Sequence, residues 1–344
     1  MERLKVASFF CGCGGMDYGL LGGFEYLGKQ YSRLAYDIVY AIDFDPYCTQ
    51  IYNLNFEHKC ICGDVRDINL KEIPNFDLLI GGFPCQSFSI SAQNPPRLGY
   101  KDERGMLFFE MVKALKEKQP RFFIAENVKG LLSANKKKAF PMILNEFREA
   151  GYKVKCKLLN SSDFGVPQKR ERIIIVGFRD DEDFFKFSFP NPTTAYHKVP
   201  LRVAIDEEAN NNDKWFFSQK AVDGMMAVKD KMNKGRIQNL DEPCNTISSH
   251  LAKVSLNSTD PVLFVNGRYR RFTPRECARI QSFPETYDLG NLADGRKYRA
   301  IGNAVPPVMM WNVAKALQQV FATSHINPDK KYKSNAKTIV AAYT

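Results

Sequence analysis

One cysteine stands where covalent chemistry could take place. Cys85 ends the run Gly81–Cys85, which follows an apolar stretch, and Pro84 fixes the backbone directly before it. A thiolate is a strong nucleophile, but a free thiol has a pKa of about 8.5, so a neighbouring positive charge would favour the reactive form. Cys85 is therefore a candidate nucleophile, although most single cysteines are inert packing groups.

A carboxylate and two arginines could complete such a site. Glu126 begins the run Glu126–Val128 after another apolar stretch, and Arg170 and Arg172 lie in the dense polar run Gln168–Arg172. A nucleophile, a carboxyl group and a cation at one place form a plausible covalent site. The alternative for the two arginines is a solvated run of charge.

A third group of residues is typical of a small-molecule site. The glycine-rich turn Phe10–Gly15 follows the first apolar run, and Asp43 and Asp64 follow the next two. Glycines let a ligand come close to the backbone, and carboxylates accept hydrogen bonds from ribose or an adenine amino group. The spaced glycines of a dinucleotide site are absent, so we expect a nucleoside-containing cofactor without a pyrophosphate. Three ordinary surface turns are the alternative.

The elements that must position these residues follow from apolar runs and helical periodicity. Strands are predicted over residues 4–10, 38–42, 60–62, 76–80, 122–125 and 173–178, and a helix over 107–118. This alternation predicts an α/β fold with a doubly wound, mostly parallel sheet and helices on both faces. The polar groups come directly after the strands, so they should share the edge formed by the strands' carboxyl ends.

The rest of the chain has a different texture. Residues 180–265 are polar and irregular, which predicts a second, smaller domain, and Pro306 and Pro307 are placed to begin a final helix near the chain end.

Composition narrows the class of protein. The 344 residues carry a formal net charge of +11, which favours a polyanionic partner such as nucleic acid. The nine cysteines form no disulfide-like or zinc-like pattern, so we expect a reducing compartment and no metal. The sequence shows neither a signal peptide nor a run of about 20 apolar residues, so we expect a cytoplasmic protein, in the bacterial cytosol or nucleoid, without membrane contact.

Taken together, the motifs resemble the cytosine-5 DNA methyltransferases of bacterial restriction–modification type. The matching runs come in that family's order and span roughly residues 5–325. They are Phe10–Gly15, Asp43–Asp45, Gly63–Asp64, Gly81–Ser89, Arg104–Phe108, Glu126–Val128, Gln168–Arg172, Arg271–Arg279 and Gly302–Pro307.

The resemblance implies a reaction and roles for four residues. S-adenosylmethionine would donate a methyl group to carbon 5 of a cytosine flipped out of a short, specific duplex sequence. Cys85 would add to carbon 6 of the ring, and Glu126, with a pKa raised by burial, would hold the ring N3 and exocyclic amine. Arg172 would contact the ring O2, and Arg170 would support the catalytic loop or a phosphate.

The resemblance also implies two sets of binding residues. The cofactor positions are Phe10, Gly12, Gly14, Gly15, Asp43, Phe44, Asp64, Val65, Pro84, Leu107, Asn303 and Ala304. The DNA positions are Gln86, Ser89, Ser91, Arg97, Thr246, His250 and Lys253. Two positions depart from the family: Asp43 is shorter than the usual glutamate, and Ser8 stands where an acidic residue is common.

The family's organisation implies domain boundaries and partners. We expect a Rossmann-like catalytic and cofactor-binding domain over 1–184, completed by 298–326, a target recognition domain with hinge over 185–297, and a basic tail over 327–344. Double-stranded DNA is the expected partner of a monomer, and a restriction endonuclease could act independently beside it. The alternatives are RNA cytosine methylation, a non-catalytic DNA-binding homologue and a nicotinamide-dependent dehydrogenase, the last disfavoured by the absent glycine fingerprint.

Overall fold

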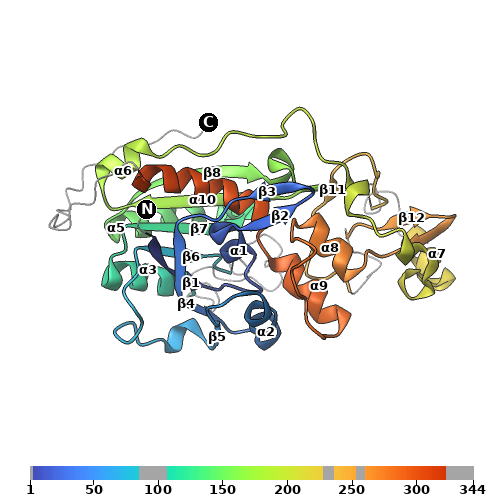
Figure 1. Cartoon of the computed structure of the whole chain (residues 1–344), viewed down its shortest axis with the longest axis horizontal. Coiled ribbons are helices and arrows are strands. Elements are labelled where there is room, and N and C mark those ends of the chain that lie inside the picture. Colours follow the sequence, from blue (N-terminus) through green and yellow to red (C-terminus); the bar gives the residue numbers. More distant parts are fainter. Residues whose placement is uncertain (1–2, 85–106, 228–235, 253–259, 323–344) are drawn as a thin grey trace.

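A seven-stranded sheet forms the centre of the larger lobe (Figure 1). The computed structural model describes residues 3–84, 107–227, 236–252 and 260–322. The strands, in spatial order, are β5 (Ile61–Cys62), β4 (Tyr36–Asp43), β1 (Leu4–Phe9), β6 (Leu78–Gly81), β7 (Phe122–Val128), β10 (Glu171–Phe178) and β8 (Lys153–Asn160). The first five run parallel, whereas β10 is antiparallel to both of its neighbours.

The predicted α/β fold with a mostly parallel sheet is confirmed, but the sequence analysis missed several strands, two groups of which belong to the larger lobe's sheet and its hairpin. One is β8, in which lysines at 153, 155 and 157 alternate with apolar residues. Such alternation is typical of a strand at a sheet edge with one face toward water. The sequence analysis predicted strands from continuous apolar runs, which β8 lacks. The other is a small hairpin of β2 (Phe24–Tyr26) and β3 (Lys29–Tyr31).

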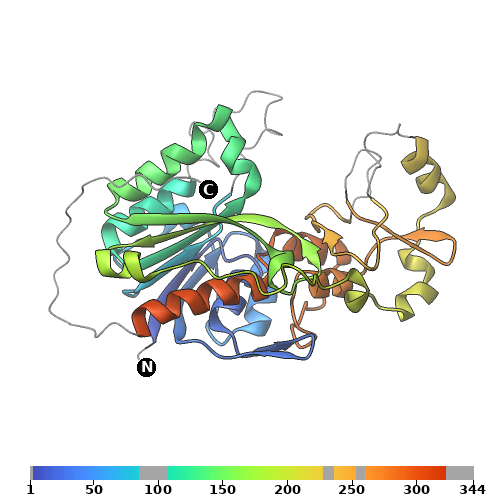
Figure 2. The ribbon, with the colours of Figure 1, turned by 90° about the horizontal axis from the view of Figure 1, so that it is seen from above.

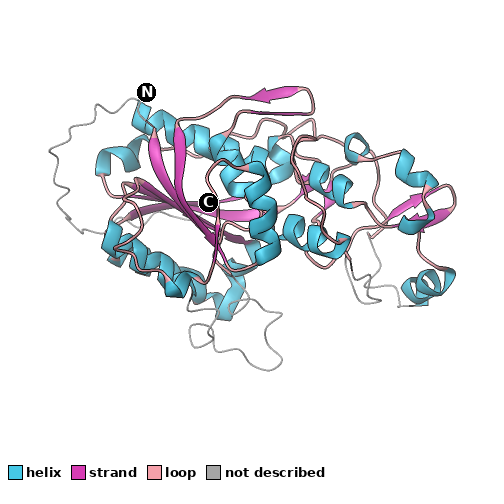
Figure 3. Ribbon diagram, turned by 60° about the horizontal axis from the view of Figure 1, so that its bottom comes forward, coloured by secondary structure: helices cyan, strands magenta, loops and turns pink. Residues whose placement is uncertain are grey.

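Helices cover both faces of the sheet, as Figures 2 and 3 show. One face is covered by α1 (Gly15–Leu21) and α10 (Pro307–Ala322), whose apolar side chains share a buried cluster with β1, β6 and β7. The other is covered by α3 (Leu107–Lys118) and α5 (Ala139–Glu149), which form a second cluster. The predicted helix over 107–118 is confirmed. The remaining elements of this lobe are α2 (Pro46–Asn55), α4 (Ala134–Lys137), β9 (Gln168–Lys169), α6 (Asp181–Lys186) and the 3-10 turns η1 (Val65–Asp67), η4 (Lys129–Ser133) and η5 (Ser161–Phe164).

The final helix returns to the first part of the chain. It begins at Pro307, as predicted, and the Tyr36 hydroxyl of β4 donates to the Ala314 carbonyl at 2.7 Å. The backbone of α1 comes very close, because a Cβ atom added at Gly19 would lie 2.3 Å from the Pro307 carbonyl oxygen. Small residues on α1 therefore allow α10 to complete the larger lobe.

The second lobe is irregular, as predicted, and shares a core with the first. It holds η6 (Leu201–Ala204), η7 (Glu208–Asn211), η8 (Asp213–Trp215), α7 (Gln219–Ala227), β11 (Cys244–Asn245), β12 (Leu263–Val265), β13 (Arg268–Arg270), α8 (Pro274–Ile280) and α9 (Asp294–Asn303). Its buried residues, among them Ile247 and Phe283, form one cluster with Cys13 of the glycine turn and Tyr52 of α2. The two lobes therefore meet through a continuous apolar core.

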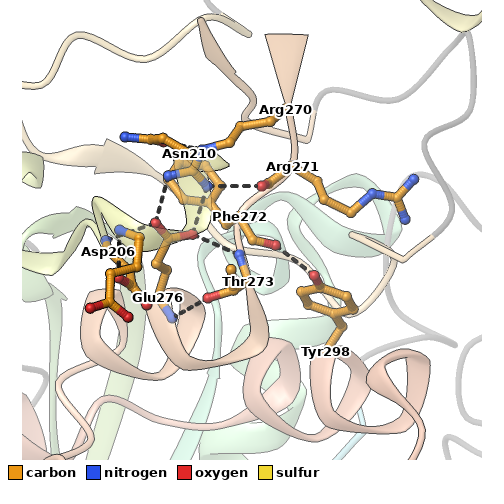
Figure 4. Close-up of polar contacts among 9 residues, drawn as sticks. Asp206, Asn210, Arg270, Arg271, Phe272, Thr273, Glu276 and Tyr298 are labelled. Atoms are coloured by element: carbon orange, nitrogen blue, oxygen red, sulfur yellow. Dashed lines mark hydrogen bonds and ion pairs between the residues drawn. The ribbon is translucent and has the colours of Figure 1, made fainter. Parts of the chain in front are cut away.

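A buried ion pair organises this lobe (Figure 4). The side chains of Arg270 and Glu276 are fully buried, with Nη2 and Oε1 2.8 Å apart. Glu276 also accepts from the backbone N–H of Thr273 at 2.7 Å and of Asp206 at 2.9 Å. Breaking one partner of such a pair typically costs about 3–5 kcal/mol. The pair thus ties α8 to β13 and to the segment before η7.

None of the helices in the described part of the chain is long and apolar enough to cross a membrane.

Candidate active site

A cavity of about 470 Å³ lies at the carboxyl ends of β1, β4, β6 and β7. This is the edge at which an open α/β sheet binds ligands. Predicted residues from distant parts of the sequence line it together: Phe10, Gly12, Gly15, Asp43, Phe44, Pro84, Leu107, Glu126, Arg170, Arg172, Asn303 and Ala304.

The glycine turn is held in place by the acidic group of β4. Asp43 Oδ2 accepts from the Gly12 N–H at 2.8 Å, and Oδ1 accepts from the Asp45 N–H at 2.9 Å. Burial raises the pKa of Asp43. Phe10 has a φ of +56°, in the left-handed region that non-glycine residues seldom adopt, which marks strain at a cavity wall.

Aromatic and charged side chains give the cavity a mixed wall. Phe44 is 62% exposed although it is a large apolar residue beside the cavity. Arg299 of α9 lies 3.4 Å from Asp45 at the same wall. An exposed ring next to carboxylates suits a ligand that has both a flat apolar part and hydroxyl or cationic groups.

Glu126 and Arg172 form an ion pair inside the cavity wall. Arg172 Nε lies 2.8 Å from Glu126 Oε1, and each side chain is only 12% exposed. The pairing follows from the antiparallel register, in which Glu126 faces Ile174 and Arg172 stands two residues further along. Burial raises the pKa of Glu126 despite the arginine, in agreement with the predicted direction. A raised pKa favours the protonated form of this carboxyl group relative to an exposed glutamate.

Arg170 is buried rather than solvated. It is 1% exposed and donates to the backbone carbonyls of Ile247 at 2.9 Å and Gly302 at 2.8 Å. Burial lowers the pKa of its guanidinium. Both interactions hold protein backbone, so the alternative of a solvated charge run is wrong for Arg170 as it is for Arg172.

Several predicted residues lie outside the described part of the chain. They are Cys85, Gln86, Ser89, Ser91, Arg97 and Lys253. Pro84, which precedes Cys85, lines the cavity, and the segment before it is fixed because Asn127 Nδ2 donates to the Phe83 carbonyl at 3.0 Å.

Three predicted cofactor residues do not line the cavity. Asp64 is paired with Arg66, whose Nη2 lies 2.6 Å from its Oδ2, and Val65 is buried in the core beneath. Gly14 has a φ of +84° and precedes α1, and a side chain there would clash with Phe56. Its role here is therefore to let the turn pack closely.

One recognition candidate, Thr246, lies beside the Gln168–Arg172 run. Strand β11 pairs with β9 in parallel, and the exposed Thr246 donates from its hydroxyl to the Lys169 carbonyl at 2.8 Å. His250 is exposed four residues later. The structure thus brings Thr246 next to the motif that carries Arg170 and Arg172.

Other residues at the site were not predicted. Asp17 of α1 lines the cavity, is fully buried, and accepts from the Tyr52 hydroxyl at 3.1 Å. Burial raises its pKa to about 7. Its position two residues after the glycine turn was the only local signal. Arg299 and Gly302 also line the cavity, and no local pattern marks Arg299.

The cysteines cluster without forming a predicted metal site. Cys11 and Cys60 are both buried, with their sulfur atoms 3.1 Å apart. Within the described ranges, no group of three or more His, Cys, Asp or Glu side chains is placed to hold a metal ion.

Comparison with known proteins agrees with this geometry. Residues 4–319 match the family described as C-5 cytosine-specific DNA methylase. The Type II methyltransferase M.FnuDI of Fusobacterium nucleatum is 35% identical over 342 residues, which covers 92% of this chain and 94% of that protein. The Type II methyltransferase M.NgoFVII of Neisseria gonorrhoeae is 33% identical, covering 95% of this chain and 90% of that protein.

Solved structures share the fold. The S. pombe Dnmt2 methyltransferase matches with a TM-score of 0.70 at 20% identity, covering 94% of this chain and 100% of that one. Because the family match spans nearly the whole chain, this protein belongs to the C-5 cytosine-specific DNA methylases and is a DNA (cytosine-5)-methyltransferase.

Proposed function

We propose that the protein transfers a methyl group from S-adenosylmethionine to carbon 5 of a cytosine flipped out of a short duplex sequence. The observation that carries this proposal is the buried Glu126–Arg172 pair in the wall of a cavity that also holds the glycine turn. One side of that cavity can accept a nucleoside, and the other offers a carboxyl group and a cation to a second, planar ligand.

The residues present fit S-adenosylmethionine. The volume of about 470 Å³ lies within the range of small-molecule sites. Phe10 and Phe44 would pack against the adenine and Asp43 would accept from the ribose hydroxyls, while Leu107, Asn303 and Ala304 would close the pocket. Asp64 would bind the adenine amino group only if its pairing with Arg66 opened. When bound, the cofactor supplies an electrophilic methyl group on its sulfonium.

The protein's own residues would prepare the base. The Cys85 thiolate adds to carbon 6, which makes carbon 5 nucleophilic. Carbon 5 would then accept the methyl group as the bond between methyl and sulfur breaks, with S-adenosylhomocysteine as the second product. Loss of the carbon 5 proton then expels the thiolate and leaves 5-methylcytosine. Glu126 holds the N3 edge, where its raised pKa favours a shared proton as negative charge develops on the ring. Arg172 neutralises charge at O2.

DNA contacts would come from the second lobe and from the residues that follow Pro84. Thr246, which is exposed beside the Gln168–Arg172 run, and the exposed His250 would contact the DNA next to the flipped base. The other proposed DNA-binding residues are Gln86, Ser89, Ser91, Arg97 and Lys253. The predicted boundaries at 184 and 298 fall within α6 and α9, so we place the recognition domain between these helices, at about 187–293.

The biological setting follows from the relatives. Both are named as Type II methyltransferases, so we propose that this enzyme is the modification arm of a restriction–modification system. We also propose that it acts as a monomer. A cognate endonuclease would act on the same sequence independently.

The first experiment is methyl transfer from labelled S-adenosylmethionine to mixed-sequence duplex DNA, followed by bisulfite sequencing. We expect label at cytosine within one short recurring context. Label on transfer RNA in place of DNA would assign the protein to RNA methylation, and the absence of label from both would overturn the proposal.

The covalent step has its own test in Cys85→Ser. The serine hydroxyl is far less nucleophilic than a thiolate at neutral pH, so turnover should be lost. Affinity for duplex DNA that contains the sequence identified by bisulfite sequencing should change little. Binding is measured by fluorescence anisotropy. A parallel loss of DNA binding would mean that Cys85 has a structural role.

A further inference from the structure

The backbone of Ile247 is held from both sides by the Gln168–Arg172 run. Its N–H donates to Gln168 Oε1 at 2.8 Å, and its carbonyl accepts from Arg170 Nη1 at 2.9 Å. Ile247 directly follows Thr246, the recognition candidate whose hydroxyl is bound by the Lys169 carbonyl. Three consecutive residues of one motif therefore fix the segment that would lie against DNA.

The same two side chains also hold the last turn of α9 with its C-cap, residues 301–304, which lines the cofactor cavity. Gln168 Nε2 donates to Gln281 Oε1 at 2.8 Å, and Gln281 Nε2 donates to the Ile301 carbonyl at 2.9 Å. Arg170 Nη2 donates to the Gly302 carbonyl at 2.8 Å. Asn303 and Ala304, which follow directly, line the cavity.

The two held segments touch each other. A Cβ atom added at Gly302 would lie 2.3 Å from the Ser248 carbonyl carbon, so only glycine permits this contact. The side chains of Gln168, Arg170 and Gln281 are at most 1% exposed. Water therefore cannot replace a broken hydrogen bond without opening the packing, and a shift of either segment leaves buried polar groups unpaired.

We propose that Gln168 and Gln281 are positioning residues which, with Arg170, join the DNA-facing segment 245–248 and the cofactor-facing turn 301–304 into one rigid junction. The inference rests on the proposed function, because that function assigns DNA to segment 245–248 and the cofactor to the turn 301–304. The junction makes the alignment of one site depend on the other, so occupancy of the cofactor cavity and engagement of DNA assist each other reciprocally.

Gln281→Met tests this because it keeps the side-chain length, removes both hydrogen bonds and touches no ligand. Gln318→Met is the control, since Gln318 on α10 accepts from the Ala35 N–H at 2.6 Å and belongs to the larger lobe, not to the junction. Two titrations are made on each protein. The first measures binding of S-adenosylhomocysteine alone by calorimetry. The second measures binding of a duplex that contains the sequence identified by bisulfite sequencing, with and without saturating S-adenosylhomocysteine.

The expected result is specific to the junction. In Gln281→Met, S-adenosylhomocysteine should bind about tenfold more weakly, because the turn that lines its cavity loses its support; tenfold corresponds to about 1.4 kcal/mol. The factor by which saturating S-adenosylhomocysteine increases the affinity for DNA should be at least fivefold smaller in the variant than in the wild type. Gln318→Met should lower Tm but leave both quantities at wild-type values.

Two outcomes would overturn the inference: unchanged binding and coupling in Gln281→Met, or an equal loss in both variants, which would indicate general destabilisation. Should Gln281→Met fail to fold, Arg170→Lys replaces it, because one ammonium cannot reproduce the planar fork to two carbonyls. A wild-type protein that binds S-adenosylhomocysteine but methylates no DNA would overturn the proposed function, while the first titration would still test the junction.

Discussion

At the scale of single residues, the carboxyl group of Glu126 is set by two opposing effects. Burial raises its pKa and the Arg172 guanidinium lowers it, with burial the larger effect. The raised pKa favours a proton shared with a base that gains negative charge, relative to an ordinary surface glutamate.

Glu126→Gln should lower the single-turnover methylation rate by about 10²- to 10⁴-fold, the usual contribution of a positioned acid or base. S-adenosylhomocysteine affinity should change by less than about threefold. The control is Glu171→Gln, because Glu171 is 40% exposed and pairs with Lys129 at the surface. If the cofactor affinity collapsed while the rate held, Glu126 would belong to the cofactor site.

Asp17 gives a pH-dependent stability. Its pKa rises from 3.8 to about 7 in the fold because it is fully buried, an effect that outweighs the hydrogen bond from the Tyr52 hydroxyl. The folded state thus binds this proton more tightly than the unfolded chain does. The resulting stability is complete below about pH 4 and is lost as the pH rises through about 7.

Asp17→Asn should remove this loss. We expect the free energy of unfolding of the wild type, relative to the variant, to fall by a few kcal/mol between about pH 4.5 and pH 8. Urea titrations at several pH values measure it, and effects of the other acidic groups cancel in the difference. Parallel curves for the two proteins would show that Asp17 does not carry the raised pKa.

At the scale of elements, the packing of α1 against α10 determines how the segment before α10 reaches the cavity. The backbone of α1 approaches Pro307 at Gly19 and the Val305 carbonyl at Gly15. Asn303 and Ala304 precede this contact, so the packing of two helices sets the position of a cavity wall.

Gly19→Ala should therefore destabilise the protein by about 1–3 kcal/mol, as overpacking does. The same substitution in an open helix interior stabilises by up to about 1 kcal/mol. The control is Gly295→Ala in α9, where the added Cβ would meet its nearest neighbour, Ala252 Cβ, at 3.7 Å, an ordinary contact. Thermal unfolding should show a lower Tm for Gly19→Ala and a higher Tm for Gly295→Ala, relative to the wild type. A change of Tm in the same direction for both variants would contradict the close approach of α1 to Pro307.

At the scale of the whole molecule, the net charge of +11 favours a polyanion. Lysine and arginine side chains that neutralise phosphates release counterions, so affinity for DNA depends on salt.

We expect affinity for duplex DNA to fall by about 10³- to 10⁵-fold between 50 and 200 mM salt if 6–10 phosphates are contacted. Affinity for S-adenosylhomocysteine should change little over the same range, because its cavity binds it through short-range contacts that do not release counterions from a phosphate backbone. Anisotropy and calorimetry measure the two. Salt-independent DNA binding would argue against a phosphate-contacting surface.

The sequence by itself determined which strands carry the site. Phe10, Asp43 and Glu126 lie within or directly after apolar runs, and the carboxyl ends of parallel strands meet at one edge, so their convergence followed from local pattern and topology. The same reasoning missed β8, because an alternating edge strand lacks the continuous apolar run of the inner strands.

Only the tertiary structure decided how the side chains pair. The antiparallel register of β10 and β7 set Arg172 against Glu126, and residues more than 70 positions apart hold Arg170 away from solvent. The Asp64–Arg66 pair, by contrast, is a local contact between residues two positions apart. Burial and hydrogen-bond partners depend on contacts between distant segments, and local periodicity, which reports only the face of an element, does not specify them.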